Sequence, residues 1–106
     1  MARLVEEAKS GREAALEELV RLIQGGVYRL ALRMLWHPED AKDATQEILL
    51  RVVTRLGSFR GEAAFTTWVY RIAANTLLDA RPGPLERMKI SFDAFAADLD
   101  AGLADA

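Results

Sequence analysis

The stretch that decides the fold is Asp40–Arg81, DAKDATQEILLRVVTRLGSFRGEAAFTTWVYRIAANTLLDAR. Apolar residues recur in it at three- and four-residue steps, the period of an amphipathic helix. The segment Gly57–Gly61 breaks this pattern with two glycines, which favour a short loop. The stretch therefore predicts two helices joined by a loop, with the rest of the chain as scaffold for this pair or as a tail leaving it.

On the first helix of the pair, we expect Asp40 to be the N-cap. At 100° per residue, one side is predicted to face the core, comprising Thr45, Ile48, Leu49, Val52 and Leu56. The opposite side carries Asp43, Gln46, Glu47, Leu50 and Thr54. An apolar Leu50 ringed by acids and amides is typical of a small protein-docking patch. A lone exposed leucine is the alternative, since such residues are common on protein surfaces.

The second helix is predicted over about residues 63–80, with Gly57 as the C-cap of the helix before it. Its core side comprises Val69, Tyr70, Ala73, Thr76, Leu77 and Ala80. A separate stripe comprises Trp68, Arg71, Asn75 and Asp79. An indole for stacking, a guanidinium for phosphate and an amide for a base edge suit nucleic acid. The alternative is a buried Trp68, with Arg71 paired to Asp79 or Glu62.

Upstream, the apolar spacing predicts a helix over about residues 13–36, which ends at His37-Pro38 because the residue before proline avoids the helical region. Ser10 lies three residues before Glu13, the spacing of a capping box. Gly25-Gly26 predicts a kink or a junction of two helices, since each glycine costs about 1 kcal/mol relative to alanine in a helix. His37 is interpreted as a boundary or capping residue rather than a ligand.

Downstream, Arg81-Pro82-Gly83-Pro84 predicts a break, so residues 1–81 are predicted to form the domain and residues 82–106 a tail. Ser91 is a candidate cap for a short helix with the apolar stripe Phe92, Phe95, Leu99 and Leu103. Residues 82–106 carry two basic and five acidic side chains. Docking on the domain, binding a partner, or ordering only in a longer protein all remain open for this tail.

The composition narrows the function. The chain of 106 residues is 51% apolar, which indicates one globular domain. It has no cysteine and one histidine, so no thiolate or histidine metal site, disulfide or cofactor site is expected. No apolar run approaches the roughly 20 residues of a membrane span, and the charged N-terminus is unlike a signal peptide, so we expect no membrane insertion and a cytoplasmic location.

Charge is unevenly distributed along the chain. The formal net charge is −2, yet residues 51–81 carry five arginines against two acids. A nucleic-acid surface, if it exists, is therefore predicted to be local, and weak by charge alone.

Three motifs in order make the family recognisable. They are Asp43-Ala44-Thr45-Gln46-Glu47, then Phe59-Arg60-Gly61, then Thr67-Trp68-Val69-Tyr70-Arg71-Ile72-Ala73-Ala74-Asn75. Together they resemble region 2 of bacterial RNA polymerase sigma factors, most closely the extracytoplasmic-function (ECF) group. The similarity covers about residues 13–81.

The resemblance implies an all-α, compact bundle of three to four helices followed by the acidic tail, in a position that matches the family's interdomain linker. It implies a transcription initiation factor, not an enzyme, that binds core RNA polymerase and the −10 promoter element. Docking on the clamp helices of the beta-prime subunit falls to Asp43, Gln46 and Glu47, with Leu50 added from the helical face. Contacts to the non-template single strand fall to Phe59, Arg60, Gly61, Phe65, Thr67, Trp68, Tyr70, Arg71 and Asn75. The resemblance also implies an anti-sigma factor as a partner, and a location at the nucleoid.

Two departures qualify the resemblance. The sequence carries no helix-turn-helix domain of the kind with which this group reads the −35 element, so we expect an excised domain or a truncated protein. The family often places several basic residues after the position of Asp79, where this chain has Arg81 followed by Pro-Gly-Pro. This difference weakens any expectation of duplex contact there.

Three other functions are alternatives. A sigma-like interaction module, acting as a decoy for polymerase or an anti-sigma factor, would keep the docking face without promoter recognition. A helix-turn-helix protein would need a more polar and basic recognition helix than Trp68–Ala80. An enzyme is the least supported, because no histidine, cysteine or glycine-rich phosphate loop accompanies the carboxylates.

Overall fold

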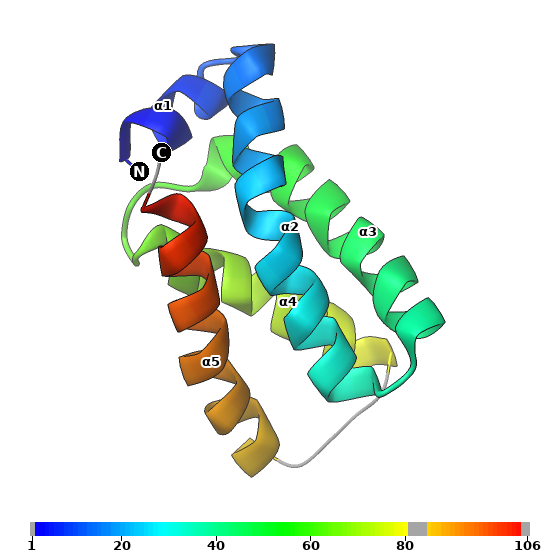
Figure 1. Ribbon diagram of the computed structural model, residues 1–106. Coiled ribbons are helices and arrows are strands. Elements are labelled where there is room, and N and C mark those ends of the chain that lie inside the picture. The colour runs from blue at the N-terminus through cyan, green and yellow to red at the C-terminus, as the bar shows by residue number, and fades with distance from the viewer. Residues whose placement is uncertain (1, 81–84, 105–106) are drawn as a thin grey trace.

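The longest helix, α2 (Glu13–Leu35), lies at the centre of the molecule and contacts all four other α-helices (Figure 1). The computed structural model describes residues 2–80 and 85–104, with the side chains of residues 3–79 and 92–104. In chain order the other elements are α1 (Ala2–Lys9), α3 (Pro38–Arg55), the 3-10 turn η1 (Leu56–Ser58), α4 (Phe65–Ala80) and α5 (Leu85–Leu103). The all-α prediction is confirmed, with five α-helices among the described residues rather than three to four.

The core is built from the apolar faces of α2, α3, α4 and α5. The largest fully buried side chains are Leu19, Ile23, Val27, Leu30, Ile48, Val52, Val69, Leu77, Phe95, Leu99 and Leu103. The predicted inner side of α3 is confirmed, since all five of its residues are buried. On α4, Val69, Ala73, Thr76 and Leu77 are buried as predicted, Tyr70 is half-buried, and the side chain of Ala80 lies outside the described residues.

α2 runs through Gly25 and Gly26 as one helix, so the two-helix alternative is wrong. The reason for a glycine here is tertiary: a Cβ on Gly26 would lie 2.9 Å from Cδ1 of Leu99 on α5. The missing side chain lets the two helices approach closely. The loss of helix propensity is offset by packing that the local sequence does not reveal.

Four predicted caps are wrong, the first two at the starts of α2 and α3. Ser10 donates its hydroxyl to the carbonyl of Glu7 in α1, 2.8 Å away, and α2 has Arg12 as its N-cap residue. α3 begins at Pro38, because proline is well suited to the first helical position, and Asp40 lies inside the first turn.

At the other end of α3, Gly57 lies inside η1 rather than at a C-cap, since the chain tightens into a 3-10 turn after Arg55. His37 is the N-cap residue of α3, in agreement with the boundary assignment, although its side chain makes no capping bond.

α5 settles part of the question left open for the tail. It packs against α2 and α4, and Phe95, Leu99 and Leu103 are buried. The helix begins at Leu85, so the assignment of Ser91 as its cap is wrong. The predicted break at Arg81–Pro84 lies outside the described residues. Within the described part, the tail docks on the helical domain.

Candidate functional site

The outer side of α3 is exposed as predicted. We call Asp43, Gln46, Glu47 and Leu50 the α3 face; all four are exposed, and Leu50 keeps 63% of its surface. Glu47 accepts a hydrogen bond from Arg51 at 3.0 Å, and Arg51 also donates to the Thr76 hydroxyl of α4 at 3.1 Å. Exposed ion pairs contribute only about 0–1 kcal/mol, so Glu47 can exchange Arg51 for a cation of a partner at little cost.

Beside the α3 face lies a hollow of about 290 Å³ between α2 and α3. Gln46 is on its rim, and Gln24, Tyr28 and Lys42 contribute polar groups. Sequence reasoning missed this hollow because three of its seven lining residues come from α2, about twenty residues earlier in the chain.

Three aromatic rings gather where η1 leads into α4. The ring centroids of Phe59, Phe65 and Trp68 lie 5.3–5.9 Å apart. Phe65 is buried, so it has no open surface for a ligand and instead supports its two neighbours. Trp68 is half-buried. Its exposure is thus intermediate between the two alternatives for this side chain, a stacking residue at the surface and a buried core residue.

A second hollow, of about 220 Å³, opens beside these rings; we call it the loop hollow. It is lined by Ser58, Phe59, Arg60, Glu62, Ala63, Trp68 and Arg71. Within the described part of the chain, Arg71 forms no ion pair with Asp79 or Glu62. Two arginines against one glutamate make the lining net positive.

The structure divides the nine predicted DNA-binding residues. Four of them line the loop hollow: Phe59, Arg60, Trp68 and Arg71. Gly61 makes the turn beside it with φ of 76°, a conformation that glycine adopts without steric cost. Asn75 is exposed one turn beyond Arg71 on α4.

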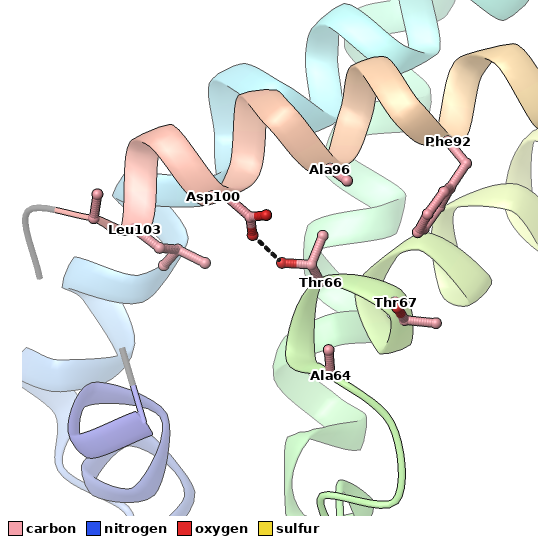
Figure 2. A pocket seen from close by; sticks show the side chains of 8 residues that line it. Ala64, Thr66, Thr67, Phe92, Ala96, Asp100 and Leu103 are labelled. Atoms are coloured by element: carbon pink, nitrogen blue, oxygen red, sulfur yellow. Dashed lines mark hydrogen bonds between the residues drawn. The ribbon is translucent and has the colours of Figure 1, made fainter.

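Thr67 and Tyr70 lie on another side of α4, which faces α5. The Tyr70 ring packs edge-on against Phe92 with centroids 4.9 Å apart, and Phe95 lies 5.6 Å away. Figure 2 shows Thr67 beside a pocket of about 550 Å³ between the start of α4 and α5. These two residues are therefore separated from the loop hollow.

Comparison with known proteins now identifies the family. The family described as sigma-70 region 2 matches residues 19–81, more than half of the chain. The chain belongs to this sigma-70 region 2 family. The match includes the α3 face, the loop hollow and α4.

Similar curated proteins are sigma factors, several of them of the ECF group. The RNA polymerase sigma-H factor of Pseudomonas aeruginosa is 39% identical over 74 residues, covering 70% of this chain and 38% of that protein. The ECF RNA polymerase sigma factor SigW of Bacillus subtilis is 33% identical over 75 residues, covering 71% and 40%. The ECF RNA polymerase sigma-E factor of Haemophilus influenzae is 41% identical over 73 residues, covering 69% and 38%. The matched part is thus about two fifths of each relative.

Within this region 2 domain, no group of histidine, aspartate and glutamate residues in the described part could hold a metal ion. None of the described helices combines the length and the apolar character that crossing a bilayer requires.

Lys9 of α1 is a support of the loop hollow that sequence reasoning missed. Its Nζ donates to the carbonyl oxygen of Phe59 at 2.5 Å and lies 5.8 Å from the centroid of the Phe59 ring. The two residues are 50 positions apart, so no local pattern could have paired them.

We expect Lys9→Met to loosen the loop of this region 2 domain while keeping the aliphatic stem. Loss of a partly buried charged hydrogen bond should lower the free energy of unfolding by about 1 kcal/mol. Amide hydrogen exchange of residues 56–64 should become faster, and Lys42→Met on exposed α3 is the matched control. Equal exchange in both variants would show that Lys9 does not hold the loop.

Partial burial of Tyr70, whose ring packs against Phe92 and Phe95 of α5, raises its pKa above the ordinary value of 10.0. As the pH rises, Tyr70 therefore loses its proton at a lower pH in the unfolded chain than in the folded protein. The contribution of Tyr70 to stability is present below pH 10 and is lost as the pH passes through the raised folded pKa. Urea unfolding between pH 8 and pH 11 should show stability falling more steeply in wild type than in Tyr70→Phe. Parallel curves would contradict this prediction.

Proposed function

We propose that this domain is the promoter-opening part of an ECF sigma factor. It docks on core RNA polymerase through the α3 face and holds the non-template strand of the −10 element at the loop hollow. The observation that carries the proposal is the convergence of Phe59, Arg60, Trp68 and Arg71 on one hollow. The family match over residues 19–81 supports it.

The α3 face has the composition of a docking surface. Leu50 supplies an exposed apolar contact, and the surrounding Asp43, Gln46 and Glu47 supply a polar rim. Its two carboxylates favour a partner surface with arginine or lysine, and we assign that surface to the clamp helices of the beta-prime subunit.

The loop hollow has the groups that a displaced base needs. Trp68 and Phe59 supply aromatic surface, and each base stacked on an aromatic side chain gains about 1–3 kcal/mol. That gain offsets an unstacking penalty of a few kcal/mol. Arg60 and Arg71 are exposed and placed for phosphates, so binding by the isolated domain should weaken strongly with salt.

The same proposal places the protein at the nucleoid in the cytoplasm, with an anti-sigma factor as a further partner. The competing hypothesis, a decoy without promoter recognition, shares the α3 face and differs in the loop hollow. Selectivity for single-stranded DNA therefore separates the two.

The docking half is tested with a beta-prime clamp-helix fragment and the full 106-residue chain. We expect wild type to bind, and Gln46→Ala and Glu47→Ala each to weaken binding by about three- to tenfold, the range for polar contacts of roughly 0.7–1.4 kcal/mol. Glu17→Ala, at an exposed position of α2, is the matched control, and circular dichroism checks helicity. If wild type fails to bind, or the control is affected equally, docking through α3 is wrong.

A further inference from the structure

α5 covers a side of α4 that carries two residues assigned to strand binding. Phe92 and Phe95 pack against the Tyr70 ring, with centroids 4.9 and 5.6 Å away. Thr67 lies in the α4–α5 pocket of about 550 Å³ (Figure 2). The pocket shows that α5 packs beside this part of α4 without filling the space between the two helices. A strand at the loop hollow that extended toward Tyr70 would meet α5.

The covering helix is acidic where it meets α4 and α2. Residues 92–104 contain Asp93, Asp98 and Asp100, and no lysine or arginine. Asp100 accepts a hydrogen bond from the Thr66 hydroxyl of α4 at 2.9 Å, as drawn in Figure 2. Asp98 binds Arg29 at 3.1 Å and lies 3.8 Å from Arg33. Carboxylate oxygens of α5 therefore accept hydrogen bonds from donors on α4 and α2, as the phosphates of a strand would.

Two glycines set how closely α5 is seated on α2. A Cβ on Gly102 would lie 2.7 Å from the backbone carbonyl oxygen of Leu22, and one on Gly26 would lie 2.9 Å from Leu99. A carbonyl of a helix backbone cannot move aside as a side-chain tip can. Docking of α5 therefore depends on the absence of one methyl group at residue 102.

We propose that the α4 surface of Thr66, Thr67 and Tyr70 binds single-stranded nucleic acid, and that α5 is its intramolecular competitor. In the free chain α5 covers this surface, and the strand reaches only the loop hollow. When α5 leaves, Tyr70 offers a second aromatic surface and Thr66 a hydroxyl donor, and three carboxylates move away from the strand. The inference rests on the proposed function, because it extends the same strand-binding site.

Gly102→Ala separates docking of α5 from its helix formation. Alanine favours the helix over glycine, yet its methyl group clashes with Leu22, and no charge changes. In the full chain we expect faster amide exchange over residues 92–103 with unchanged exchange in α3. Affinity for a fluorescent single-stranded oligonucleotide at ~50 mM salt should rise about fivefold, because the competent state is more populated. Ala101→Gln, on the exposed side of the same helix, is the control and should match wild type.

Asp98→Asn with Asp100→Asn provides a second route that leaves the apolar contacts of α5 intact. It should also raise affinity for the oligonucleotide, and this increase should be smaller at high ionic strength. If α5 is released and affinity does not change, the competitor role is overturned and binding at the loop hollow stands. If release accelerates exchange equally in α2 and α3, α5 is a structural helix and the inference is wrong. If no variant and no wild type binds the oligonucleotide, the proposed strand-binding function itself fails, and the inference fails with it.

Discussion

Trp68→Ala should lower the affinity of the domain for a single-stranded −10 oligonucleotide by about fivefold or more. The estimate follows from about 1–3 kcal/mol for one base stacked on an aromatic ring, with 1.4 kcal/mol for each factor of ten. Trp68 is one of two half-buried members of the ring cluster that borders the loop hollow, so its indole is held in place and still partly open. Fluorescence anisotropy at low salt is the measurement.

The chain contains a matched control for this substitution. Trp36, the other tryptophan, is 62% exposed at the turn between α2 and α3, away from the loop hollow. Trp36→Ala should leave affinity within about twofold, since surface substitutions change free energies by about 0.5 kcal/mol or less. Trp68→Phe should retain part of the affinity because a ring remains. If Trp68→Ala binds as well as wild type at equal helicity, stacking on Trp68 is excluded and the result favours the decoy hypothesis.

The α3 face could be predicted from sequence because its information is local. Residues at three- and four-residue spacing share a side of a helix whatever lies around it, and the exposed Leu50 and buried Ile48 follow from that geometry. Four of the nine residues predicted to contact the strand lie together for a similar reason: Phe59 and Arg60 are adjacent, and Trp68 and Arg71 are one helical turn apart. The loop between them is short, so they meet at one hollow.

What could not be predicted depends on contacts between distant segments. Lys9 meets Phe59 across 50 residues, and Gly26 meets Leu99 across two helices. The local sequence predicts that Gly26 interrupts a helix, whereas in the structure Gly26 allows α2 and α5 to pack closely. The same limitation placed Thr67 and Tyr70 with Trp68, because nothing in the sequence shows that α5 folds back over that side of α4.

The predicted caps failed for a different reason. Several residues near each helix end satisfied a capping rule, and the rules alone do not rank them. Pro38 competes with Asp40 for the start of α3, and the fixed φ of proline decides in favour of the earlier start.

Ile48→Ala and Leu50→Ala should separate folding from docking on the same helix. Ile48 is fully buried in α3, so truncation should lower the free energy of unfolding by about 2–5 kcal/mol. Small domains have about 5–15 kcal/mol in total, so this is a large share. Leu50 is 63% exposed, so its truncation should change stability by no more than about 0.5 kcal/mol.

Binding should show the reverse order. Leu50→Ala removes the apolar contact of the α3 face. It should weaken binding of the clamp-helix fragment about fivefold, equivalent to roughly 1 kcal/mol of lost burial. Ile48→Ala, measured at a temperature where circular dichroism shows it folded, should bind within about twofold of wild type, because its side chain never reaches the surface. Urea unfolding and titration on the same preparations give both quantities. A stable Leu50→Ala variant with undiminished binding would make Leu50 an ordinary exposed leucine, and the docking face would then depend on Asp43, Gln46 and Glu47 alone.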